Sequence, residues 1–159
     1  PSAARWSRYA GDIARANVWT RGTSISMFLR RRVVDAVGDF DETLGLGSGT
    51  PWGSGEETDY LLRAIAAGFV IRYEPSLTVF HPPTRTEFTP ETIASGTRYG
   101  AGMGRVIRKH RYPWWFAGYH VGRAVGGAAL AIARARIAEA RFHLGVARGR
   151  ARGWLAKES

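Results

Sequence analysis

The segment GSGEETDYLLR, residues 53–63, gathers three carboxylates at the start of a predicted helix. Ser54 precedes Glu57 by three positions, which is the spacing of a capping box and predicts that the helix begins at Glu56. The apolar residues that follow predict a buried helix side, and the helix dipole lowers the cost of holding Glu56, Glu57 and Asp59 together. The same spacing also fits a purely structural cap with an Asp59–Arg63 ion pair, and local spacing alone favours that structural role.

The composition is that of a folded protein. The chain has 159 residues, enough for one domain with a core, and 45% of them are hydrophobic and 12% aromatic. It has no cysteine, which excludes disulfides and thiolate metal sites. No signal-peptide pattern is visible, and because the chain opens on Pro1 we expect a processed product or a fragment of a longer protein.

The charge is unevenly distributed along the chain. Residues 1–97 hold 10 basic and 11 acidic residues, whereas residues 98–159 hold 13 basic and 2 acidic residues. The formal net charge of +10 therefore comes from the C-terminal part, where nearly all the basic residues are arginines. Such an asymmetry indicates an anionic partner surface.

The first half of the chain is expected to combine short helices, one strand and a long loop. Alternating and then continuous apolar residues predict the strand, and Gly38 is expected to close a brief helix. Loops as long as the one predicted here are usually functional or mobile. The expected elements are a helix over Ala3–Ala16, a strand over Thr23–Leu29, a helix over Arg30–Val37 and a loop over Asp39–Gly55.

The second half is expected to hold two short strands and then only helices. Gly68 should end the carboxylate helix, and Thr89 and Pro90 are the cap and first-turn residues of a long helix that its glycines make intrinsically weak. The expected elements are strands over Val70–Tyr73 and Thr78–His81, helices over Pro90–His110 and Trp114–Ala147, and a basic tail over Arg148–Ser159. The predicted fold class is thus α/β, with a few mixed strands within residues 1–89 and a basic α-helical extension over residues 90–159.

Five short motifs occur in an order that is typical of one enzyme family. They are GTS at 22–24 with Phe28, RR at 30–31, VGDFDE at 37–42, GEETDY at 55–60 with Arg63, and Gly68 followed by His81. In this order the chain resembles the acceptor-side half of family 2 glycosyltransferases, and it is similar to the galactosyltransferase C-terminal domain. The matching region covers about residues 20–81, and YGAG at 99–102 with RKH at 108–110 resembles the helical extension of bacterial members.

The resemblance implies the C-terminal half of a GT-A-type, Rossmann-like domain that transfers a sugar from a nucleotide-sugar donor to a hydroxyl acceptor with inversion. Glu57 takes the position of the general base, one methylene longer than the aspartate typical of the family. A base needs a carboxylate within hydrogen-bond reach of the hydroxyl, and a helix start after a long loop supplies such a placement. The alternative is that Glu57 serves only as the cap partner of Ser54.

The resemblance also implies an acceptor site, made of Asp41, Glu42, Trp52, Glu56 and Asp59. Asp41 and Glu42 lie in the Gly-Phe-Asp-Glu turn of the family, although Asp41 could equally hydrogen-bond its own turn. Trp52 could stack on an acceptor sugar or be buried within its loop. Residues 39–41 also spell the metal-binding Asp-x-Asp pattern, but we do not assign it because these residues belong to the turn.

A metal site is implied by His81, which is expected to close a strand just before Pro82. In several relatives a histidine at this place completes the shell of a divalent metal bound to the nucleotide diphosphate. Imidazole together with carboxylate suits Mn²⁺ better than Mg²⁺, and we expect one of these two ions as cofactor. A structural histidine at a strand end is the alternative.

The half of the family domain that carries the nucleotide site is missing from this sequence. We therefore expect either a fragment of a longer enzyme or a chain whose N-terminal half is supplied by a partner. The other expected partners are the nucleotide-sugar donor and a glycan or lipid-linked acceptor.

Two other classes of function fit the basic C-terminal part. Aromatic residues at 114–119 followed by arginines fit a helix on a membrane surface, while Val121–Ala133 is too short and too rich in Ala and Gly to span a bilayer. This interpretation is compatible with an enzyme held at the cytoplasmic face of an anionic membrane. A pI near 11.0 also fits nucleic-acid binding, which we disfavour because no helix-turn-helix, zinc or RNA-binding signature is visible and the acidic cluster would have no role.

Overall fold

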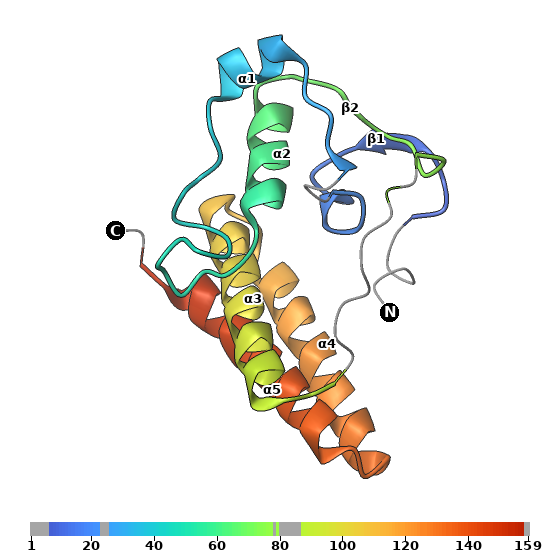
Figure 1. Ribbon diagram of the computed structural model, residues 1–159, viewed down its shortest axis with the longest axis vertical. Helices are drawn as coiled ribbons and strands as arrows, with labels where there is room; N and C mark the ends of the chain where they lie inside the picture. Colours follow the sequence, from blue (N-terminus) through green and yellow to red (C-terminus); the bar gives the residue numbers. More distant parts are fainter. Residues whose placement is uncertain (1–6, 23–25, 78, 80–86, 158–159) are drawn as a thin grey trace. The chain divides into compact units, whose positions relative to one another are not determined.

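The computed structural model describes residues 7–22, 26–77, 79 and 87–157 (Figure 1). The described residues divide into two compact units, one from 1–41 and 56–86 (the N-terminal unit) and one from 42–55 and 87–159 (the helical unit). The elements of the N-terminal unit are β1 (Gly11–Ile13), the 3-10 helix η2 (Val18–Thr20), α1 (Arg31–Val37), α2 (Glu56–Ala66) and β2 (Ile71–Tyr73). Those of the helical unit are α3 (Pro90–Lys109), α4 (Trp114–Ala133) and α5 (Ile137–Leu155).

The predicted α/β, Rossmann-like fold class is wrong. Helices dominate the described residues, and the sheet that they contain has two antiparallel strands, with Asp12 opposite Arg72. A Rossmann-like half needs parallel strands joined by crossover helices, and no such pair exists in the described part of the chain. Residues 26–29 of the predicted strand Thr23–Leu29 form no strand, and Phe28 is 83% exposed, so its apolar character does not mark a buried strand.

The N-terminal unit corrects one helix prediction and confirms one strand. Within the predicted helix Ala3–Ala16, residues 11–13 instead pair with β2, so pairing along the chain overrides a weak helical pattern. β2 lies within the predicted strand Val70–Tyr73. The other predicted strand, Thr78–His81, falls mostly outside the described residues, and Val79 is not in a strand.

The two helices of the N-terminal unit begin and end close to where the sequence predicts. α1 ends at Val37 and is closed by Gly38, whose positive φ of 76° favours glycine. α2 begins at Glu56 as predicted and buries Tyr60, Leu61 and Leu62. Its apolar side therefore anchors the carboxylates of its first turn on the core of this unit.

The helical unit consists of three long helices, with α4 running opposite to α3 and α5 (Figure 1). The predicted start of α3 is confirmed, because the Thr89 hydroxyl accepts from the Thr92 N–H and Pro90 is the first helical residue. The predicted single helix Trp114–Ala147 is wrong, since the chain turns at Ala135, whose φ is 54°. The predicted basic tail is also wrong as far as residue 155, because α5 continues to Leu155.

Glycines let α3 and α5 pack in direct backbone contact. Glycines recur every four residues on both helices, at positions 96, 100 and 104 of α3 and 145, 149 and 153 of α5. A Cβ at Gly100 would come within 2.5 Å of the Val146 carbonyl oxygen, and one at Gly149 would overlap the Thr97 carbonyl oxygen. The glycines that weaken α3 as an isolated helix therefore make room for its neighbour.

Candidate functional site

The first turn of α2 holds the three carboxylates that the sequence singles out. Glu56, Glu57 and Asp59 occupy it together, at the end of the helix where the peptide dipoles favour negative charge. Their environments differ: Asp59 has 0% of its surface exposed, whereas Glu56 and Glu57 are half-buried. The first turn thus contains one buried carboxylate, Asp59, and two side chains that are partly exposed to solvent, Glu56 and Glu57.

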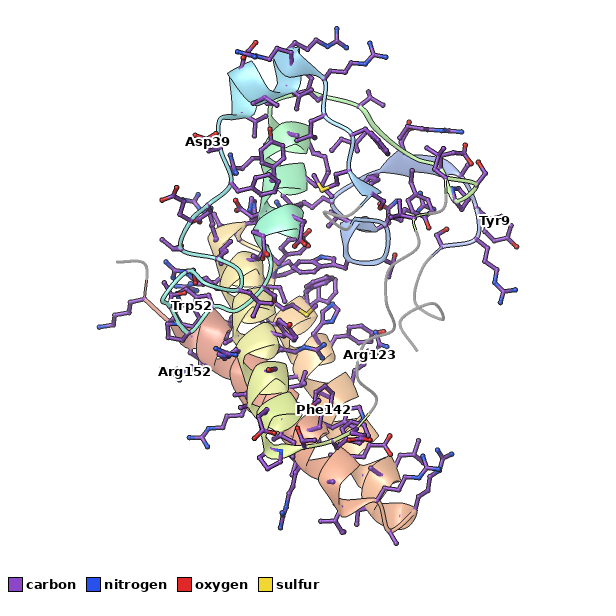
Figure 2. The ribbon with its side chains drawn as sticks, in the orientation of Figure 1. Tyr9, Asp39, Trp52, Arg123, Phe142 and Arg152 are labelled. Carbon is purple, nitrogen blue, oxygen red and sulfur yellow. The ribbon has the colours of Figure 1, made fainter. Side chains whose placement is uncertain are left out.

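Arg63 connects the buried carboxylate to the turn after α1. Its Nε donates to Asp59 Oδ2 over 2.9 Å, and its two terminal nitrogens donate to the carbonyl oxygens of Val37 and Asp39, each over 2.7 Å. The ring of Phe40 stacks on that of Tyr60 at 4.6 Å. Figure 2 shows Asp39 in the chain segment that leaves α1. The turn at residues 38–41 and the carboxylate helix therefore form one connected structure.

Glu56 is the carboxylate with the most unusual surroundings. Its Oε2 is buried and has no hydrogen-bond partner among the described residues. Burial raises the pKa of Glu56, and the neighbouring Glu57 raises it further, while a hydrogen bond from the backbone of Glu56 works in the opposite direction. A buried carboxylate oxygen without a donor is costly for folding and is typical of a functional site.

The predicted acceptor residues fall into both units. The N-terminal unit contains Glu56, Glu57 and Asp59, together with the turn that holds the half-buried Asp41. Glu42, which is exposed, and Trp52, which is half-buried, belong to the helical unit. The structure thus brings together part of the predicted acceptor site within one unit.

The loop that precedes α2 is attached to α3. The Gly53 N–H donates to the Arg98 carbonyl over 3.2 Å, and the Ser54 hydroxyl, predicted to cap α2, donates to the Tyr99 carbonyl over 2.9 Å. Gly102 leaves no room for a side chain against the Ser54 backbone. The guanidinium of Arg105 lies 5.9 Å from the centre of the Trp52 ring, which Figure 2 shows in this loop. Residues 53 and 54 are therefore fixed by the helical unit.

A metal site is not found in the described part of the chain. No group of three or more His, Asp or Glu side chains among the described residues could hold a metal ion. His81 lies outside the described residues, so its role as a ligand stays a prediction.

Sequence reasoning missed two features of this site. The i,i+4 spacing predicts the Asp59–Arg63 pair, but nothing in it predicts that Arg63 also binds two carbonyls near Gly38. The burial of Glu56 depends on packing that no local pattern encodes. No local sequence signal could therefore have found either feature.

Comparisons with protein-family models, with curated proteins and with solved structures find no match for this chain.

Proposed function

We propose that the first turn of α2 is the acceptor side of a glycosyltransferase active site, in which Glu57 removes the proton from the acceptor hydroxyl. The observation that carries the proposal is the connection made by Arg63, which joins residues 37–41 to the carboxylate helix. These segments carry two separate motifs of the family that the sequence resembles. A base must be held by rigid surroundings to act on a bound hydroxyl, and this connection supplies them.

Each carboxylate takes a different role in this proposal. Glu57, half-buried, accepts the proton. Glu56, half-buried beside Glu57, accepts a hydrogen bond from an acceptor hydroxyl. Asp59 is fully buried and acts through Arg63 as a positioning residue. The chemistry thus uses the solvent-reached carboxylates, and the buried one holds their helix.

The proposed reaction is a single displacement. The acceptor oxygen bonds to the anomeric carbon while the bond from that carbon to the nucleotide phosphate breaks, and the nucleoside diphosphate leaves with the electron pair. The proton of the acceptor hydroxyl passes to Glu57. No covalent intermediate with the protein forms, so the configuration inverts. The donor site is assigned to a segment or partner beyond these residues.

The test is donor turnover by the enzyme assembled with its donor-binding half. Glu57→Gln keeps the size of the side chain but removes the proton acceptor, so the rate should fall by about 10²- to 10⁴-fold. Glu56→Gln is the matched control in the same turn, and it should raise the KM for the acceptor more than it lowers kcat. If Glu57→Gln keeps more than about a tenth of the turnover, Glu57 is not the base.

A further inference from the structure

One side of α4 is apolar and exposed along the whole helix. Arg123 is the one charged residue between Trp114 and Ala133. The other side packs on α5 through small residues and His120. A long exposed apolar surface is rarely left in water and usually marks an interaction site. The large exposed residues are Trp114, Trp115, Tyr119, Val125, Leu130 and Ile132, which we call the α4 surface.

Arginines without carboxylate partners flank the α4 surface. Arg108 and Arg111 precede α4 and Arg134 follows it, and none of the three forms an ion pair among the described residues. No acidic residue occurs between Glu91 and Glu139, so nothing near in sequence balances this charge. The surroundings of the apolar surface are therefore complementary to an anionic partner.

A cleft of about 420 Å³ opens at the start of α4. It is lined by Arg108, Arg111, Tyr112, Trp114 and Trp154. Arginine binds phosphate oxygens through its planar fork of donors, and tryptophan favours the boundary between water and the apolar part of a bilayer. Trp114 is 74% exposed, so it borders both this cleft and solvent. The cleft thus suits a phosphate group that is attached to an apolar body.

We propose that the α4 surface docks on an anionic lipid bilayer, with α4 lying in the plane of the interface. Trp114, Trp115 and Tyr119 insert at the level of the headgroups, and the cleft between Arg108 and Arg111 binds a lipid phosphate. No helix in the described part of the chain has the length and hydropathy to cross a bilayer. Helices that combine an apolar side with aromatic and basic residues can lie in the plane of the interface. This proposal uses none of the residues assigned to the acceptor site.

Cosedimentation of the whole chain with phosphatidylcholine vesicles, with and without phosphatidylglycerol, tests the docking. Binding should require phosphatidylglycerol and weaken as salt rises. Arg108→Gln with Arg111→Gln should weaken it roughly 30-fold, because each arginine near an anionic surface contributes about a factor of five. Trp115→Ser should weaken binding without lowering the melting temperature, because its side chain is exposed. Soluble glycerophosphate added as a competitor should displace little of the vesicle-bound protein, since it offers the apolar surface nothing to enter.

The matched control removes the same charge from another part of the helical unit. Arg148 and Arg152 are exposed on α5, and Figure 2 shows Arg152 and Arg123 at opposite edges of the three helices. Arg148→Gln with Arg152→Gln should leave most of the vesicle binding. Equal losses for the two pairs would overturn the proposal, because the attraction would then depend on net charge alone. Dimerisation that is lost in Trp115→Ser, with no vesicle binding, would also overturn it and assign the surface to a second copy.

Discussion

The Nε of Arg63 lies 2.9 Å from Oδ2 of Asp59, four residues earlier on α2. On α1 the Nε of Arg31 lies at the same distance from Oδ1 of Asp35, also four residues away. Their surroundings differ: the Asp59 side chain is fully buried, whereas those of Arg31 and Asp35 are 89% and 59% exposed. The same spacing in the sequence therefore describes one ion pair inside the N-terminal unit and one on its surface.

We expect the loss of the buried pair to be costly. Asp59→Asn leaves the Arg63 guanidinium without its charge partner and should lower the free energy of unfolding by about 3–5 kcal/mol. Asp35→Asn is the control and should cost less than about 1 kcal/mol, because water screens the exposed pair. Urea denaturation of both variants provides the measurement. Similar small losses would mean that Arg63 holds the turn after α1 without Asp59.

The glycines of the helical unit give a second prediction with an internal control. Gly100→Ala places a methyl group against the Val146 carbonyl and should destabilise the α3–α5 contact by about 1–3 kcal/mol. Gly122→Ala on α4 meets nothing within 4 Å and should stabilise the protein by roughly 0.5–1 kcal/mol, since alanine favours helix. Thermal melts of the two variants should therefore shift in opposite directions. A Gly100→Ala variant that melts no lower than the unaltered protein would show that α3 and α5 do not pack through Gly100.

Local signals in the sequence predict several helix ends but not the sheet. Thr89 with Pro90 and the acidic run at Glu56 mark the starts of α3 and α2, because caps and first-turn residues act over a few positions. The pairing of β1 with β2 joins residues about sixty positions apart, which no local pattern encodes. The break at Ala135 is missed because alanine and arginine favour helix and neither glycine nor proline marks the turn there.

The candidate site is predictable in part. The carboxylates of the first turn follow from their position after Gly55, since residues 56–59 are adjacent in sequence. Their unequal burial and the second contacts of Arg63 depend on tertiary packing. The close contact between α3 and α5 is not predicted, because the glycines of α3 are taken only as residues that weaken a helix. The informative feature is that glycines recur every four residues on both helices.

The attachment of the loop to α3 gives a third prediction. Gly102→Ala places a methyl group against the backbone of Ser54 and should release residues 52–55 from α3. Limited proteolysis should then cut the loop faster than in the unaltered chain. Ser54→Ala removes only the hydrogen bond to the Tyr99 carbonyl and should cost about 1 kcal/mol with little change in cleavage. Unchanged proteolysis of Gly102→Ala would contradict the attachment.

His120 predicts a dependence of stability on pH. Its burial, followed by the charges of Arg150 and Arg123, lowers its pKa to about 4. In the unfolded chain His120 has a pKa of about 6.5, so between these two values the unfolded chain binds a proton at His120 and the folded chain does not. The free energy of unfolding should therefore fall as the pH drops from about 6.5 toward about 4. His120→Gln does not titrate, and in urea denaturation its slope over this window should be smaller. Identical slopes would contradict the lowered pKa.

Glu56 predicts a pH dependence of stability opposite to that of His120, and the test of it also bears on the proposed acceptor site. Burial, reinforced by the charge of Glu57, raises the pKa of Glu56, so the folded state prefers the neutral carboxyl. Its stabilising contribution is complete below the unfolded pKa, near 4.5, and is lost as the pH rises through the folded value. Glu56→Gln is permanently neutral, so it should melt higher than the unaltered chain at neutral pH, and the difference should close below about pH 4.5. Glu57→Gln removes the same charge from the same turn and should not stabilise, because a carboxylate at a helix start is favourable. If both variants are stabilised equally, the gain reflects repulsion between the two carboxylates and not the burial of Glu56.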